Sequence, residues 1–263
     1  MPLSPGAALV TGAGRRLGQA FARELGARGW SVALHCMGSV GGAEEVAAEI
    51  RAAGAGAAVL KADLLDLDQV EALVPRAAEA LGAPLTCLVN NASIFEHDDI
   101  ATATRDSWDR AVGSNLRAPY VLTQAFAAQA SQAGRDAAGL PVATGLILNM
   151  IDQRVWKPTP EFLSYSLAKA GLWWLTRTTA QALAPRIRVC AIGPGPTLQG
   201  DRQSAEHFAA QRDATLLQRG SDPAEMRRAL AWLLESDGFT GQMLALDGGQ
   251  HLAWQTPDVL GVE

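Results

Sequence analysis

The sequence contains little cysteine and shows no spacing typical of a metal site. Its 263 residues include only three cysteines and four histidines. An odd, sparse set of cysteines argues against a disulfide framework and fits a reducing cytoplasm, where we expect the protein to reside. Because no cysteine pair has the spacing of a zinc site, we expect no bound metal. Cys190 has no assignable role, and we interpret it as a buried, unreactive thiol.

Long hydrophobic runs and an excess of positive charge are also missing. No apolar run approaches the roughly 18 residues that a membrane-spanning helix needs. The first six residues carry no basic segment, so we expect no secretory signal. The 22 basic and 27 acidic residues give a net charge of −5, which argues against a general binder of nucleic acids or anionic membranes. We therefore expect neither among the partners of this protein.

What the sequence does contain is a regular alternation of short apolar runs with alanine-rich amphipathic segments. Hydrophobic residues make up 48% of the chain, which is enough for a full core. The apolar runs are hydrophobic on both alternations, which is typical of a parallel sheet covered by helices. We predict an α/β fold in a single domain over residues 1–263. The expected strands cover 7–11, 31–35, 57–61, 85–90, 145–150, 186–192 and 242–246, and the expected helices 17–28, 43–53, 67–81, 107–132, 162–183 and 223–234.

Two longer segments interrupt this alternation. Residues 133–144 are rich in small side chains and are expected to form an irregular or disordered loop. Residues 193–220 are the longest stretch without a predicted strand. Loops of that length are uncommon unless they serve a function, so we predict that 193–220 forms a lid over a ligand site.

A glycine-rich segment, Thr11–Gly18, joins the first predicted strand to the first predicted helix. Such a turn lets backbone N–H groups and the helix N-terminus meet a pyrophosphate, which predicts dinucleotide binding. Folds that select NAD usually place an acid at the end of the second strand, but residues 34–39 contain none. Arg15 and Arg16 lie in the neighbouring loop. A missing carboxylate beside available guanidinium groups favours the 2′-phosphate of NADP.

Tyr165 and Lys169 are four residues apart in a predicted helix and therefore share one helical face. A nearby ammonium group lowers the pKa of a phenol because it favours the anion. We therefore expect a tyrosine that exchanges a proton with a substrate near neutral pH.

These pieces occur in an order and at a spacing that resembles the short-chain dehydrogenase/reductase family. The resemblance covers the whole chain and implies a seven-stranded, doubly wound Rossmann fold with helices on both faces, NAD(P) binding, hydride transfer and a homotetramer. The C-terminal segment with Leu252 and Trp254 resembles the family's tail, which packs at subunit interfaces. The matching segments are Thr11–Gly18, Asp63-Leu64, Asn90-Asn91-Ala92, Asn115, Tyr165 with Lys169, and Pro194-Gly195.

The resemblance also implies roles for individual residues. Asp63 would lie at the adenine, and Asn90 would support the cofactor region. Asn115 would hold a water of the proton relay, and Lys169 would also bind the nicotinamide ribose. The implied cofactor-binding set is Thr11, Gly12, Arg15, Arg16, Leu17, Gly18, His35, Ser39, Asp63, Leu64, Asn90, Ala92, Tyr165, Lys169, Pro194, Gly195 and Thr197.

Two departures from the general family pattern narrow the expected substrate. Arg16 replaces the middle glycine of the loop, and Asp152 replaces the serine that usually lies thirteen residues before the tyrosine. Both departures resemble the pteridine reductase branch, which also matches the segment 91–95, where a serine and a phenylalanine line the pterin pocket. His35 and Ser39 match cofactor positions of that branch, whereas its basic residue between them is Gly38 here. The implied substrate-binding residues are Arg16, Ser93, Phe95, Asp152 and Tyr165.

An acid at position 152 suits a pterin. A carbonyl oxygen needs hydrogen-bond donors, which a serine supplies, whereas a pterin ring takes hydride at carbon and a proton at a ring nitrogen. A carboxyl coupled to Tyr165 can pass that proton. Asp152 should oppose the phenolate and Lys169 should favour it, so the three groups are expected to titrate as one unit. Together with Asn115 they form the predicted catalytic set.

The sequence therefore predicts an NADPH-dependent reductase that converts a dihydropterin or dihydrofolate to the tetrahydro form. One alternative is a short-chain reductase of a carbonyl or imine, with Asp152 adapted to that substrate. A second alternative is a catalytically silent NADP-binding regulator. Asn115, Tyr165 and Lys169 argue against the regulator, because a protein that only binds does not need proton donors.

Overall fold

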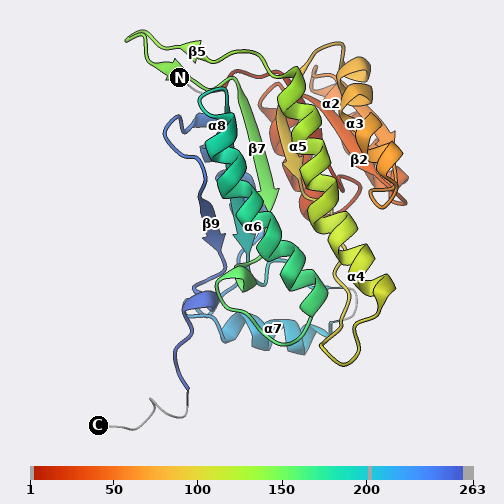
Figure 1. Cartoon of the computed structure of the whole chain (residues 1–263), viewed down its shortest axis with the longest axis vertical. Helices are drawn as coiled ribbons and strands as arrows, with labels where there is room; N and C mark the ends of the chain where they lie inside the picture. The colour runs from red at the N-terminus through yellow and green to blue at the C-terminus, as the bar shows by residue number, and fades with distance from the viewer. Residues whose placement is uncertain (1–2, 201–202, 257–263) are drawn as a thin grey trace.

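The computed structural model describes residues 3–200 and 203–256, and its centre is a seven-stranded sheet (Figure 1). The strands follow the order β3-β2-β1-β4-β7-β8-β9, and every neighbouring pair is parallel. The predicted strands and the predicted parallel sheet are thus confirmed. The strands are β1 (Ala7–Val10), β2 (Ser31–Cys36), β3 (Ala57–Lys61), β4 (Leu85–Asn90), β7 (Gly145–Met150), β8 (Ile187–Pro194) and β9 (Met243–Leu246).

Helices cover both faces of the sheet, which confirms the doubly wound prediction. On one face α1, α2 and α8 share an apolar core with alternate strand side chains such as Ala8 and Val10. On the other face α3, α5 and α6 share a second core with the intervening side chains, such as Ala7 and Leu9. The strands are apolar on both alternations because both of their faces are buried. The helices are α1 (Arg16–Ala27), α2 (Val40–Ala52), α3 (Leu67–Leu81), α5 (Ala118–Gln129), α6 (Leu163–Leu183) and α8 (Pro223–Glu235).

The chain changes its direction of strand addition between β1 and β4. From β1 it moves to β2 and β3 on one side, and it then returns to place β4 on the other side of β1. Ligands of open parallel sheets bind outside the carboxyl ends of the strands at such a switch point. The arrowheads of β7 and β9 point toward the end of the molecule where α7 (Ala205–Asp213) lies (Figure 1). That end is therefore where a ligand site is expected.

The predicted long helix over 107–132 is present, but it runs from Arg105 to Gln129 and contains an irregularity. It consists of α4 (Arg105–Val112), a π-helical turn (Gly113–Arg117) and α5. The π-helical turn contains Asn115, whose side-chain amide is bonded to the backbone of Ile94 in a distant segment. Such a turn distorts a helix without removing its apolar face, so periodicity does not reveal it.

The two predicted loops contain short regular elements. Residues 133–144 hold a hairpin of β5 (Gly134–Arg135) and β6 (Pro141–Val142), so the expectation of an irregular loop is wrong. This hairpin lies at the opposite end of the molecule from α7 (Figure 1). The candidate lid over 193–220 contains the end of β8 and all of α7, and its positions 201–202 lie outside the described residues. Among the residues described, we find no helix long and apolar enough to cross a membrane.

Candidate active site

The tight turn after β1 and the first turn of α1 each contain one position that requires glycine. Gly12 has a left-handed backbone with φ of +65°, and a Cβ there would lie 2.9 Å from the Ala92 Cα atom. A Cβ at Gly18 would collide with the Gly12 carbonyl oxygen. Leu17 packs inward against the core. The turn therefore keeps its backbone close to the carboxyl end of β1, where a ligand can approach it.

Arg16 also has a left-handed backbone, with φ of +55°. That conformation costs a residue with a side chain about 1–2 kcal/mol, and it occurs at the position where the resembled family has glycine. The Arg16 guanidinium donates hydrogen bonds to the carbonyls of Gln199 and Leu198 over 2.6 and 3.1 Å. Arg16 thus joins the glycine-rich turn to the candidate lid, a contact that the sequence did not reveal.

His35 supports the turn from within the sheet. The Gly12 N–H group donates a hydrogen bond to His35 Nδ1 over 3.2 Å, and His35 Nε2 lies 3.1 Å from the Ala62 carbonyl oxygen. The ring is only 2% exposed, and burial is the main reason that the pKa of His35 is lowered. His35 is therefore a neutral side chain that positions the turn.

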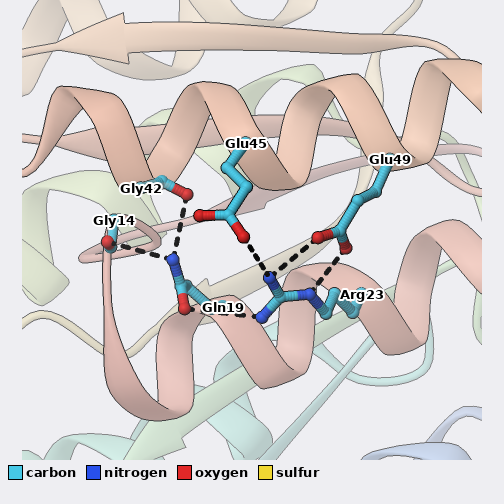
Figure 2. A network of polar contacts seen from close by, with 6 residues as sticks. All are labelled: Gly14, Gln19, Arg23, Gly42, Glu45 and Glu49. Atoms are coloured by element: carbon cyan, nitrogen blue, oxygen red, sulfur yellow. Dashed lines mark hydrogen bonds and ion pairs between the residues drawn. The ribbon is translucent and has the colours of Figure 1, made fainter.

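Gln19 and Arg23 connect the same turn to α2 (Figure 2). The Gln19 amide donates hydrogen bonds to the carbonyls of Gly14 and Gly42, over 3.3 and 2.9 Å. One helical turn further along α1, the Arg23 guanidinium forms a two-pronged pair with Glu49 of α2, over 2.7 and 3.0 Å. This network holds the starts of α1 and α2 together, so the turn between β1 and α1 has a fixed shape.

The start of α1 suits a phosphate group. Its N-cap residue, Arg15, makes no side-chain capping bond, and the first helical turn contains no acid. An uncapped helix start attracts anions because its N–H groups and helix dipole present positive charge. Arg15 is exposed, and the segment from Met37 to Ser39 after β2 carries no carboxylate. These residues fit a dinucleotide with a 2′-phosphate.

Several other residues of the implied cofactor-binding set make hydrogen bonds or core contacts within the protein. Asp63 Oδ1 accepts the Leu65 N–H group over 2.9 Å, and the Leu64 side chain is buried in the core. Thr197 Oγ1 donates to the Gly195 carbonyl over 3.1 Å in the turn that follows Pro194. These contacts shape the rim of the site at the ends of β3 and β8.

The segment after β4 is tied to β1 and β7. The Thr11 hydroxyl oxygen accepts hydrogen bonds from the N–H groups of Asn91 and Ala92, over 2.9 and 3.0 Å. The Asn90 amide donates to Asn149 Oδ1 over 2.8 Å, which joins β4 to β7 inside the protein. Asn90 therefore joins the carboxyl ends of β4 and β7, and its role in supporting the cofactor region stays a prediction.

Asp152 and Tyr165 form the polar centre of the site. The Tyr165 hydroxyl donates a hydrogen bond to Asp152 Oδ2 over 2.8 Å, and Asp152 Oδ1 accepts the Arg154 N–H group over 2.9 Å. Lys169 Nζ donates to the Met150 carbonyl over 2.7 Å and lies 5.6 Å from the centre of the Tyr165 ring. The end of β7 and the first turns of α6 thus bring the three predicted catalytic side chains together.

Burial dominates the electrostatics of this centre. It raises the pKa of Asp152, although hydrogen bonds and the charges of Arg154 and Lys169 act in the opposite direction. Burial and the neighbouring Asp152 charge raise the pKa of Tyr165 well above its usual range. Burial also lowers the pKa of Lys169 to about 8. The expectation that Lys169 lowers the tyrosine pKa is therefore wrong here, because the Asp152 carboxyl contacts the phenol while Nζ bonds Met150.

Asn115 fixes the loop that follows β4. Its amide oxygen accepts the Ile94 N–H group over 3.0 Å, and its amide nitrogen donates to the Ile94 carbonyl over 2.9 Å. Both ends of the side chain are thus used to position Ile94, which lies between Ser93 and Phe95.

Phe95 lies beside the polar centre and is not part of the core. Its side chain is 43% exposed. The ring stacks on Phe162 with centroids 4.2 Å apart, and it meets the Tyr165 ring edge-on at 4.7 Å. Ser93 is also exposed on the same loop. The loop after β4 thus brings Phe95 to the side of the site where Tyr165 lies and leaves Ser93 exposed.

Sequence reasoning missed two residues that shape this side of the site. Phe162 precedes α6 with a left-handed φ of +54°, which directs its ring onto Phe95. Asp98 is buried, and its carboxylate accepts the Ser164 N–H group over 3.0 Å and the Ser107 hydroxyl over 3.2 Å. An aromatic residue one helical turn before Tyr165 was a signal for Phe162. Nothing local in the sequence indicated Asp98.

Cys190 is buried in β8, and burial is the main reason that its pKa rises to about 12. This agrees with the interpretation of an unreactive thiol. Among residues 3–200 and 203–256, no group of three or more histidine, cysteine or carboxylate side chains is arranged to hold a metal ion.

Comparisons with known proteins match this arrangement. Residues 6–208 match the family model of the short chain dehydrogenases. A putative ketoacyl reductase of the granaticin polyketide synthase from Streptomyces violaceoruber is 30% identical over 93% of this chain and 96% of its own length. The 3-oxoacyl-[acyl-carrier-protein] reductase FabG of Staphylococcus aureus is 29% identical over 93% and 98%. The crystal structure of FolM alternative dihydrofolate reductase 1 from Brucella canis, complexed with NADP, is 43% identical and covers 98% of both chains with a TM-score of 0.90.

Proposed function

The chain belongs to the short-chain dehydrogenase family, and we propose that it is an NADPH-dependent reductase of pterins that converts a dihydropterin or dihydrofolate to the tetrahydro form. The observation that carries this proposal is the 2.8 Å hydrogen bond from the Tyr165 hydroxyl to the Asp152 carboxyl. A carboxyl at this position can pass a proton to a ring nitrogen, whereas a carbonyl oxygen needs only hydrogen-bond donors, which a serine supplies. The likeness to a Brucella protein described as a dihydrofolate reductase supports the same substrate class.

The choice of NADPH rests on the glycine-rich turn and its surroundings. The uncapped start of α1, the exposed Arg15 and the lack of an acid after β2 suit a pyrophosphate and a 2′-phosphate. The Brucella canis structure was determined with NADP. When bound, NADPH supplies the hydride. In this proposal Lys169, whose ammonium group donates a hydrogen bond to the Met150 carbonyl, binds the nicotinamide ribose.

The protein's own residues then deliver the proton. The raised pKa of Asp152 lets this carboxyl hold a proton at a higher pH than an ordinary aspartate. The raised pKa of Tyr165 keeps its hydroxyl protonated beside Asp152. A proton lost from one member of the pair to the substrate nitrogen can be replaced across the 2.8 Å hydrogen bond. The two groups thus act as one proton donor.

The loop after β4 supplies the pterin pocket in this proposal. Phe95 offers part of an aromatic ring to a flat heterocycle, and Ser93 offers a hydroxyl to its polar edge. Asn115 holds the backbone of Ile94 between them, so the spacing of the two side chains is fixed before the substrate binds.

We also propose a homotetramer in the cytoplasm. An apolar groove between α5 and α6 is lined by the exposed side chains of Tyr120 and Trp174. Leu252 and Trp254 near the C-terminus are exposed as well. Large apolar side chains gathered on a surface mark a protein contact. The three free cysteines fit a reducing compartment.

A second candidate function is reduction of a carbonyl substrate, which the 29–30% identity to ketoacyl reductases favours. A single experiment separates the candidates. The loss of NADPH absorbance is followed with dihydrobiopterin, dihydrofolate, a β-ketoacyl thioester and simple ketones. Turnover of the two pterins but not of the ketones supports the proposal. Turnover of ketones alone supports the second candidate, and tight NADPH binding without any turnover indicates a regulator.

A further inference from the structure

Arg154 lies beside the proton-delivering pair and is held there by its neighbours. It belongs to a short 3-10 helix (Gln153–Val155) that follows Asp152. Its guanidinium carbon lies 5.0 Å from the centre of the Phe162 ring and 5.8 Å from that of Phe95. Arg154 Nη1 donates a hydrogen bond to the Thr159 hydroxyl over 2.9 Å. The aromatic pair and the hydroxyl thus fix a cation at the edge of the proposed pterin pocket.

In the described part of the chain, no acid lies within ion-pair distance of the Arg154 guanidinium. Arg110 in α4 differs, because its Nη2 atom lies 2.9 Å from Glu96 Oε1. The oxygens of Asp152 are already engaged, one by the Tyr165 hydroxyl and the other by the Arg154 backbone. Several guanidinium N–H donors of Arg154 therefore remain for a ligand.

We propose that Arg154 forms an anion subsite at the mouth of the pterin pocket and binds a negatively charged substrate tail. The inference rests on the proposed function and specifies its substrate class. A guanidinium pairs best with a carboxylate or phosphate, because its planar donors match two acceptor oxygens. The preferred substrate is then a pterin with an anionic tail, such as the glutamate carboxylates of dihydrofolate or the phosphate of a dihydroneopterin phosphate. The tail of dihydrobiopterin is neutral and therefore cannot form an ion pair with Arg154.

Arg154 also lies close enough to Asp152 to lower its pKa, and this second influence must be separated from tail binding. An effect on Asp152 changes proton delivery to every pterin, so it alters all substrates alike. An effect on the tail changes only substrates that carry an anion. The ratio of KM values for anionic and neutral pterins therefore isolates the subsite.

The test compares wild type with Arg154→Gln on dihydrofolate, dihydroneopterin phosphate and dihydrobiopterin at saturating NADPH. We expect Arg154→Gln to raise KM about tenfold for one or both anionic substrates and less than about twofold for dihydrobiopterin. Arg154→Lys should recover part of the loss, because it retains the charge without the planar fork. The charge-matched control is Arg51→Gln in α2, which should leave all three KM values unchanged. Thermal melting of each variant verifies that it is folded.

Which anionic substrate responds identifies the tail as a carboxylate or a phosphate. Equal changes in KM for the anionic and neutral substrates, or no change in any, would overturn the subsite and leave the proposed function intact. Failure of the wild-type enzyme to reduce any of the three pterins would overturn the proposed function, and the subsite with it.

Discussion

The N-termini of α1 and α6 both follow carboxyl ends of sheet strands, yet they are completed in different ways. α1 begins after Arg15 without a side-chain cap and without an acid in its first turn. α6 begins after Phe162, which provides no cap either. There, however, the buried Asp98 carboxylate from the loop after β4 accepts the Ser164 N–H group over 3.0 Å. The N–H groups at the start of α1 are thus left for a ligand, whereas at the start of α6 the Asp98 carboxylate of the protein itself accepts one such group.

The two helix starts therefore have different tasks in our account: the start of α1 binds the cofactor, and the start of α6 positions side chains. At α1 the backbone and the glycines form the site, so a phosphate can complete the helix start. At α6 an internal carboxylate completes it, and the two residues that flank Ser164 gain a fixed position as a result. Those are Leu163 and Tyr165, and the latter donates to Asp152. The side of the site that we propose to deliver the proton is therefore built by tertiary contacts, and substitutions there should affect chemistry more than cofactor binding.

The largest effect is expected from Tyr165→Phe. Removal of the hydroxyl eliminates one member of the proton-donating pair, so kcat for a dihydropterin should fall by about 10²–10⁴. The Kd for NADPH should stay within about threefold, because the ring and Lys169 remain. Steady-state kinetics and a fluorescence titration with NADPH measure the two quantities. If the Kd for NADPH rose by the same factor as kcat fell, Tyr165 would serve cofactor binding as much as proton delivery, which would contradict the account.

Among the residues of the proposed pterin pocket, the largest effect on KM is expected from Phe95→Ala. Loss of an aromatic face should raise the KM for a dihydropterin about tenfold, and the exposed position of the ring predicts a small change in melting temperature. Phe95→Tyr retains the ring and serves as the matched control. A large loss of melting temperature with an unchanged KM would show that Phe95 serves the fold alone.

Asp98→Asn tests the internal cap directly. Burial opposes the charge of Asp98, but hydrogen bonds from Ser164, Ser107 and Leu163 outweigh it and lower the pKa of Asp98. Because the folded-state pKa is the lower one, the stabilisation is present above the unfolded pKa and is lost as the pH falls through the folded value. The variant should reduce the free energy of unfolding at pH 7 by about 1 kcal/mol and kcat by about fivefold.

Asp222→Asn is the matched control for that variant. Asp222 caps α8 by accepting the Glu225 N–H group over 2.7 Å, and α8 covers the opposite face of the sheet from α6. Denaturant unfolding should show a similar loss for both variants, while kcat should fall only for Asp98→Asn. Equal kcat values in the two variants would contradict a positioning role for Asp98.

The smallest effect is expected from Arg15→Glu at the α1 terminus. We expect the wild type to prefer NADPH over NADH by at least about tenfold in kcat/KM, which corresponds to about 1.4 kcal/mol. A carboxylate at position 15 should reduce this preference below about threefold, because it repels the 2′-phosphate. Kinetics with both cofactors measure the ratio, and a wild type without any preference would refute the assignment.

The two helix starts also differ in how well the sequence predicted them. The α1 site lies within Thr11–Gly18, so its residues are neighbours in the chain as well as in space. Asp152 could be predicted as well, because it occupies the position thirteen residues before Tyr165 where the resembled family usually has a serine. Asp98 and Ser164 meet across a separation of 66 positions, and no local pattern reports such a contact. The tyrosine pKa was misjudged for a related reason, since burial and the direction of Lys169 depend on the complete fold.

Asp152→Asn should affect stability and activity in opposite directions. Burial raises the pKa of Asp152 in the folded protein, so ionised Asp152 destabilises the fold as the pH rises through that value. The neutral amide avoids this cost. The variant should therefore melt at a higher temperature than wild type at pH 8, and the difference should shrink as the pH is lowered. Calorimetry of both proteins at pH 8 and at lower pH values measures this difference in melting temperature and its sign.

The central claim is that Asp152 and Tyr165 deliver the proton to a pterin, and the pH dependence of pterin turnover tests it most directly. The measurement compares kcat/KM for a dihydropterin in wild type and Asp152→Asn from about pH 5 to pH 9. Wild-type activity should fall as the pH rises through the elevated pKa of Asp152. The variant should be about 10² or more slower and should lack that step. Full pterin activity in Asp152→Asn across the whole range would contradict the account.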